Sequence, residues 1–197
     1  MRKNWTIVRI AAVMVVIFLA TQARPTGAVT IRPAEPQPAS ATLQPGLAVD
    51  YAYGEVRFLG EAESWVNYTK PGLPLVGFVY GDTVLGEKTF TAGASAFVIA
   101  FIKGFMKFEA GTHELEFQSN DGRHKCQTKG VVRVTAPKTG WYPVTALYFN
   151  RKFTACMDLS IRPAGGEWDF TSPEIYAHIA QLHGQVTGPD STRVAMP

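Results

Sequence analysis

The chain has 197 residues, of which 46% are hydrophobic, and 19 basic against 16 acidic residues give a formal net charge of +3. This length allows one domain of ordinary size with short additional segments. Four of the basic residues lie within residues 1–28, which contain no acidic residue. The remaining 15 basic and 16 acidic residues give a net charge of −1, so no basic domain argues for nucleic-acid binding.

Residues 1–28 have the pattern of a secretory signal peptide. A basic start precedes an apolar run of eleven residues from Ile10 to Ala20, and small residues then offer cleavage after Ala23 or Ala28. The alternative is a membrane anchor, but such a run spans too little of a hydrocarbon core about 30 Å thick. We therefore expect a secreted or periplasmic protein whose mature chain does not span a membrane.

The mature chain divides into a short spacer, one domain and a tail. Residues 29–42 contain three prolines among small polar residues, which predicts a mobile spacer because this composition buries little apolar surface. β-prone hydrophobic residues resume at Leu43, and the expected domain covers residues 43–183. The composition of residues 184–197 is typical of a frayed tail.

The first half of the domain carries a mixed pattern. Gly and Pro are frequent from Gly60 to Gly86, which indicates irregular structure around one or two short strands. The apolar run from Ala94 to Phe108 is rich in β-branched and aromatic residues, which favours strand over buried helix. Because Gly104 interrupts this run, we expect two strands that join near Lys103.

The second half alternates between apolar and polar residues with a period of two. Such alternation predicts antiparallel strands with one buried face. In the first of these strands Leu115 and Phe117 share the apolar face, whereas Glu114 and Glu116 point to the other face, which we expect to be solvated. The four segments with this pattern, each of which ends at or near a turn former, are Gly111–Gly122, Val131–Thr135, Gly140–Arg151 and Ala155–Ile161. The sequence therefore predicts an all-β fold, followed by a short irregular or helical segment near Glu174–His183.

An ordered set of motifs resembles the PA14 domain family. The set consists of Pro45-Gly-Leu, Gly111-Thr-His-Glu-Leu-Glu-Phe-Gln-Ser-Asn-Asp-Gly, Gly140-Trp-Tyr-Pro-Val, Tyr148-Phe-Asn and the strand Ala155–Ile161. The resemblance covers residues 43–178, and its most specific part is Ser119-Asn-Asp-Gly followed by Gly140-Trp-Tyr. It implies a PA14-like antiparallel β-barrel or sandwich that recognises carbohydrate more often than it catalyses a reaction.

The loop at Asn120 and Asp121 is the main candidate for ligand binding. Asn-Asp-Gly is first a turn signal, since Asn and Asp tolerate left-handed backbone and Gly adopts positive φ. The resemblance implies a ligand-binding loop that in some members holds Ca²⁺ between paired aspartates. Here the first of the pair is Asn120, so Asp121 is the one charged candidate metal ligand, and Ca²⁺ prefers six to eight oxygens. Turn, sugar contact and Ca²⁺ site all remain open from the sequence.

Tryptophans and cysteines supply the other candidates. Trp65 and Trp168 could present flat apolar faces to a sugar, or they could belong to the core. Cys126 and Cys156 could form a disulfide, which would close a loop of about 30 residues and contribute roughly 3–4 kcal/mol. Two separately buried thiols are the alternative.

No nucleophile, phosphate-loop or dinucleotide motif is found, so we do not expect an enzyme. The sequence predicts a non-catalytic module that binds a glycan or cell-envelope polysaccharide. The alternative is a structural subunit of the periplasm or cell surface that binds another envelope protein.

Overall fold

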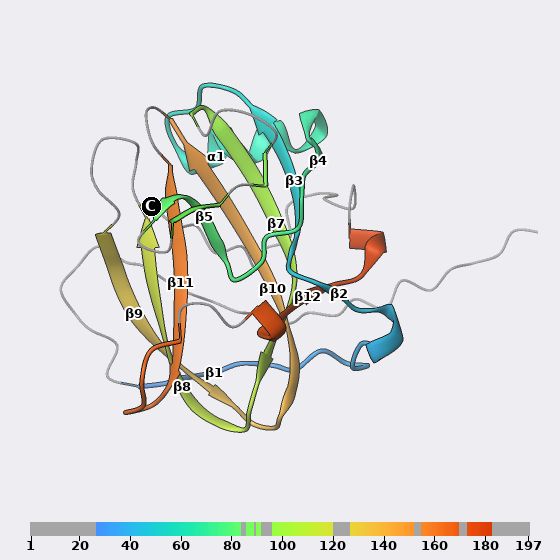
Figure 1. Ribbon diagram of the computed structural model, residues 1–197, viewed down its shortest axis with the longest axis vertical. Helices are drawn as coiled ribbons and strands as arrows, with labels where there is room; N and C mark the ends of the chain where they lie inside the picture. The colour runs from blue at the N-terminus through green and yellow to red at the C-terminus, as the bar shows by residue number, and fades with distance from the viewer. Residues whose placement is uncertain are drawn as a thin grey trace, which may run out of the picture.

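The computed structural model describes residues 27–83, 86–88, 90–91, 96–119, 127–151, 155–169 and 173–182. Most of the predicted signal peptide, the predicted tail, Asn120, Asp121 and Cys126 lie outside these residues. Two sheets lie face to face and form a β-sandwich (Figure 1).

The first sheet is built around the predicted alternating strands. In spatial order it contains β1 (Val29–Thr30), β9 (Gln127–Ala136), β8 (Gly111–Ser119), β11 (Cys156–Pro163), β5 (Val79–Thr83) and β6 (Gly86–Lys88). Neighbouring strands are antiparallel, apart from β1, which runs parallel to β9.

The second sheet is organised by its longest strands. It contains β2 (Gln44–Pro45), β3 (Ala48–Tyr53), β4 (Lys70–Pro71), β7 (Val98–Phe108), β10 (Gly140–Asn150) and β12 (Tyr176–His178). β10 pairs with β7 along its whole length, whereas β3 pairs with the first half of β7 and β12 with Phe105 and Met106. The helix α1 (Leu59–Glu63) and the 3₁₀ turn η2 (Ser64–Tyr68) connect β3 to β4, and η1 covers Ser40–Thr42.

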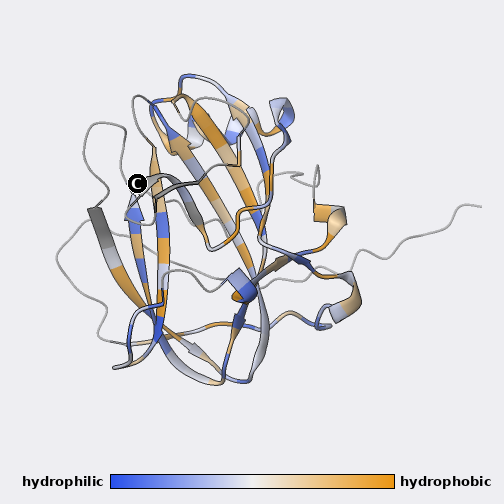
Figure 2. Ribbon diagram, viewed as in Figure 1, coloured by the Kyte–Doolittle hydropathy of each residue, from blue (hydrophilic) through white to orange (hydrophobic). Residues whose placement is uncertain are grey.

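The period-two pattern places the core between the sheets, as predicted. Leu115 and Phe117 of β8 contribute to it, as do Met157 and Leu159 of β11. A second, smaller cluster lies on the outer face of the second sheet, where α1 and η2 cover it; it contains Val56, Ala62, Ile99, Phe101 and Leu147. Figure 2 shows how hydrophobic residues gather along β7 and β10, which are buried on both faces only over part of their length.

The prediction of two strands between Ala94 and Phe108 is wrong, because β7 is one continuous strand through Gly104. A Cβ at Gly104 would lie 2.4 Å from the carbonyl oxygen of Ala177 and 2.7 Å from a methyl group of Leu47. Glycine is therefore required here for the close approach of β12, and it does not end the strand.

Residues 29–42 also differ from the mobile spacer that we predicted. Val29 and Thr30 pair with Val134 and Thr135 of β9, and the next residue, Ile31, is buried in the main core. The segment then reaches the other sheet, where the Gln37 side chain accepts from the Trp141 amide and donates to the Trp141 carbonyl at 2.7 and 3.0 Å. The proline-rich segment therefore connects an edge of the first sheet to β10 at an edge of the second sheet. We call residues 29–37 the N-terminal strap.

The C-terminal segment is only partly as predicted. Its helical parts are the short 3₁₀ turns η3 (Pro173–Ile175) and η4 (Ala180–Leu182), and β12 lies between them. Tyr176 and Ala177 are buried and pair with Met106 and Phe105 of β7, and Tyr176 belongs to the main core. Because Tyr176 and Ala177 pair with β7, residues 176–178 form a strand and not the irregular or helical segment that the sequence predicted.

Candidate functional site

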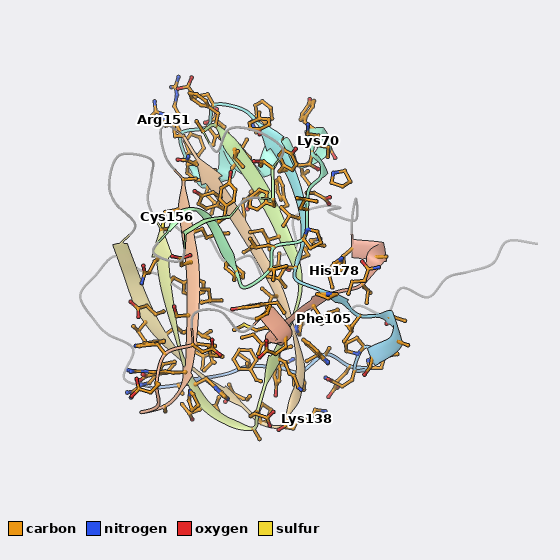
Figure 3. The ribbon with its side chains drawn as sticks, in the orientation of Figure 1. Lys70, Phe105, Lys138, Arg151, Cys156 and His178 are labelled. Carbon is orange, nitrogen blue, oxygen red and sulfur yellow. The ribbon has the colours of Figure 1, made fainter. Side chains whose placement is uncertain are left out.

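Asn120 and Asp121 lie outside the described residues, but in the sequence they directly follow Ser119, the last residue of β8. At this end of the sandwich Ser119 pairs with Met157 near the start of β11, and Asn150 and Tyr53 both pair with Val98 at the start of β7. In Figure 3 Arg151 lies at the top of the view, Cys156 lies below it in the upper half, and Lys138 lies at the bottom, at the opposite end. The topology therefore gathers the ends of β3, β8 and β10 with the starts of β7 and β11.

Buried polar side chains lie beneath this end. Ser119, Tyr148 and Asn150 are almost inaccessible to solvent, and burial raises the pKa of the Tyr148 hydroxyl above its usual range. On the outer face of β11, burial raises the pKa of the Asp158 carboxyl to about 6. An Asp that titrates near neutral pH reports a desolvated site, which is a feature of functional and of structural positions alike.

Trp65 lies on the outer side of the second sheet, on η2. Its ring is half-buried and packs against the small cluster under α1. The ring also lies directly over Gly54, where a Cβ would come within 2.4 Å of it. Tyr68 stands beside Trp65 with a ring-centroid separation of 5.8 Å and is 74% exposed. The structure therefore places Trp65 in a partly exposed aromatic pair.

Trp168 lies beside the first sheet and far along β11 from Cys156. An isolated bridge between Ile161 and Asp169 holds its segment against the end of β11. The guanidinium of Arg162 stacks on the indole ring, 4.2 Å from its centroid. One face of Trp168 is thus already covered by a cation, and the structure does not bring Trp168 together with Trp65.

Arg162 belongs to a three-residue ion cluster that the sequence analysis missed. Glu114, at the centre of β8, lies directly opposite Arg133 of β9 and Arg162 of β11. Arg133 donates to Oε1 of Glu114 at 2.8 Å, and Arg162 donates to Oε2 at 2.6 Å. The prediction of a solvated Glu114 is wrong, since its side chain is only 6% exposed.

The two arginines determine the electrostatics of this cluster. Hydrogen bonds from Arg133 and Arg162 hold the pKa of the Glu114 carboxyl below its usual range, although desolvation acts in the opposite direction. The sequence pattern already indicated that all three residues lie on the face of their strands that points away from the core. The sequence alone did not give the strand register, which places Arg133 and Arg162 opposite Glu114.

The structure also bears on the predicted disulfide, on the candidate metal site and on a membrane span. Cys156 is fully buried at the start of β11, and its predicted partner Cys126 is outside the described residues, so the disulfide stays a prediction. Within the described part of the chain, no three His, Cys, Asp or Glu side chains converge as metal ligands. Of the helices that the structure describes, none is both long and apolar enough to cross a bilayer.

Comparison with known proteins yields structural similarity only. No protein-family model matches the chain, and no curated protein matches it in sequence. The structure is similar to the PA14 domain of the antifreeze protein MpAFP, with a TM-score of 0.56 and 14% identity over 72% of this chain and 93% of that one.

Two yeast adhesin domains are similar to nearly the same extent. The A domain of epithelial adhesin 6 from Candida glabrata, solved in complex with Galβ1-3GlcNAc, gives a TM-score of 0.53 and 9% identity over 78% of this chain and 97% of that one. The A domain of epithelial adhesin 9, solved with the same disaccharide, gives 0.52 and 10% identity over 75% and 95% of the two chains. At these identities the similarity establishes the fold, and the chain has a PA14-like all-β fold.

Proposed function

We propose that the mature chain is an exported, non-catalytic module that binds carbohydrate. The observation that carries this proposal is the PA14-like sandwich, which is similar to adhesin domains solved in complex with a galactose-containing disaccharide. Binding sites often lie in loops that a rigid scaffold positions. Here the ends of several strands meet near Ser119, the residue that precedes Asn120 and Asp121 in the sequence.

Asn120 and Asp121 are the proposed ligand contacts of this loop. Their side chains supply an amide and a carboxylate, which can accept hydrogen bonds from sugar hydroxyls, and the Asn120 amide can also donate. The same oxygens are of the kind that Ca²⁺ prefers, with Asp121 as the charged ligand. We leave Trp168 out of this proposed contact set, because Arg162 covers one face of its ring at the far end of β11.

A glycan array tests the proposal. The mature chain from Val29 is screened with Ca²⁺ and with chelator, beside Asp121→Ala and the control Glu174→Ala, which alters an exposed residue on η3. We expect glycan binding that Asp121→Ala abolishes and Glu174→Ala preserves, and loss with chelator would add the metal. Release of reducing ends from a bound glycan would contradict a non-catalytic role. Silence across the array would contradict carbohydrate binding and favour the protein-partner alternative.

A further inference from the structure

The aromatic pair on η2 is a second surface feature that the Asn120–Asp121 loop does not explain. A 3₁₀ turn has three residues per turn, so side chains three positions apart are eclipsed. Trp65 and Tyr68 have this spacing, and their rings meet at 63° with centroids 5.8 Å apart. Because Tyr68 is 74% exposed, most of its surface is open to solvent.

The turn that presents this pair is fixed at both ends. The Ser64 hydroxyl donates to the Glu61 carbonyl at 2.7 Å, and the Thr69 hydroxyl donates to the Val66 carbonyl at 2.9 Å. From below, Trp65 rests on Gly54 and on the small hydrophobic cluster. A binding surface whose side chains are already held loses less conformational entropy when a ligand arrives.

An exposed polar side chain accompanies the two rings. Asn67 lies between them in the sequence and is exposed, with an amide that both donates and accepts hydrogen bonds. A pyranose ring has the matching chemistry, since it has an apolar C–H face and a rim of hydroxyl groups. A protein hot spot would instead centre on a larger apolar area within an interface of standard size.

We propose that Trp65, Asn67 and Tyr68 form a second carbohydrate subsite, which stacks neutral pyranose units of an extended polysaccharide. The subsite rests on the proposed carbohydrate-binding function and lies on the outer side of the second sheet, whereas β8, the strand that precedes Asn120 and Asp121 in the sequence, belongs to the first sheet. Two separated subsites would allow one module to hold a long chain at two points, which raises apparent affinity without new contacts at either site.

Affinity electrophoresis in native gels tests the subsite, with galactomannan, xyloglucan and β-1,3-glucan as the probes. Each variant is made in the wild-type mature chain and on an Asp121→Ala background. We expect Tyr68→Ala to weaken retardation by the bound polysaccharide about fivefold on both backgrounds, and Asn67→Ala to weaken it in the same direction. Phe58→Ala is the matched control, since it removes an aromatic ring that is 63% exposed at the start of α1.

The outcomes separate the two proposals. Weakened binding in Asp121→Ala with unchanged binding in Tyr68→Ala and Asn67→Ala would overturn the second subsite and leave the proposed function in place. Equal losses in Phe58→Ala and Tyr68→Ala would also overturn it, because the effect would not be specific to the pair. If no gel retards the wild-type chain and the glycan array is silent, both proposals fall. Far-UV circular dichroism verifies that each variant folds.

Discussion

Replacing Glu114 with Gln isolates the electrostatic contribution of the ion cluster. Gln has almost the same volume, but one of its two terminal atoms is a nitrogen donor, which would face a guanidinium donor. The variant therefore loses the negative charge. It also loses at least one of the two hydrogen bonds that the arginines donate to the carboxylate oxygens at 2.6–2.8 Å. Because the side chain is only 6% exposed, water cannot easily replace the lost partner.

The expected loss follows from the exposure of each partner. A hydrogen bond to a charged group contributes about 1.5–3 kcal/mol, and we assign about 2 kcal/mol to Arg162, whose side chain is 30% exposed. Arg133 is 59% exposed, so solvent screening reduces its share to about 1 kcal/mol. Urea denaturation should therefore show Glu114→Gln to be about 3 kcal/mol less stable, with Tm lower by roughly 6–12 °C.

Three measurements could refute this reasoning. Glu167→Gln, a control at an exposed acidic residue, should change stability by less than about 0.5 kcal/mol. In double-mutant cycles with Arg→Met variants, Glu114 should couple more strongly to Arg162 than to Arg133. The pKa of Glu114 is lower in the folded state than its usual value. Its contribution to the free energy of unfolding is therefore complete above the usual Glu pKa, and it is lost as pH falls through the folded-state pKa. A loss below about 1 kcal/mol, reversed couplings, or a gap that persists unchanged at acidic pH would each contradict the cluster's role.

Three further predictions follow from buried groups and from the N-terminal strap. Asp158, with its pKa raised to about 6, should make the fold less stable as pH rises from about 4 to 6. Asp158→Asn should remove this pH dependence, on the order of 3 kcal/mol for the whole pKa shift, in denaturation curves measured across that range. Cys126 and Cys156 should give one disulfide-linked peptide pair by mass spectrometry, and two thiols that titrate in denaturant without reductant would contradict it. Deletion of residues 29–37 should abolish cooperative unfolding, because it removes Ile31 from the core, whereas removal of residues 1–28 should not.

Local pattern predicted most of the fold, and long-range pairing decided the exceptions. Alternation along β8, β10 and β11 specified which residues face the core, because one buried face imposes a period of two on each strand. Gly104 misled the prediction for β7, since a glycine that ends a strand and one that admits a neighbouring strand look the same in sequence. The strap with Ile31 was missed for a similar reason: its contacts are with β9 and β10, about 100 residues away.

The candidate site was less predictable than the fold. The resemblance led to Asn120 and Asp121, but not to the pairing that brings other strand ends to the same end of the sandwich. The residues that surround a tryptophan are likewise set by how the strands and turns pack, which the sequence does not show. Trp65 has a glycine beneath it and an exposed tyrosine beside it, and neither the contact with Gly54 nor the exposure of Tyr68 is visible in composition.

Trp168 shows how the register separates two equal sequence candidates. The bridge between Asp169 and Ile161 places its ring beside Arg162, the next residue on β11, and Glu114 holds that arginine from the other side. A sugar that stacked on this face would have to displace a guanidinium bound by charge-assisted hydrogen bonds.

Trp168→Ala should therefore lower the free energy of unfolding and leave polysaccharide retardation unchanged. The loss should be about 1–2 kcal/mol, because the variant removes a cation–π contact and half-buried apolar area. Tyr68→Ala should have the opposite effect, with stability nearly unchanged and retardation weakened. If Trp168→Ala weakens retardation at full stability, then Arg162 yields its place to the ligand, and the ion cluster belongs to the binding site and not only to the scaffold.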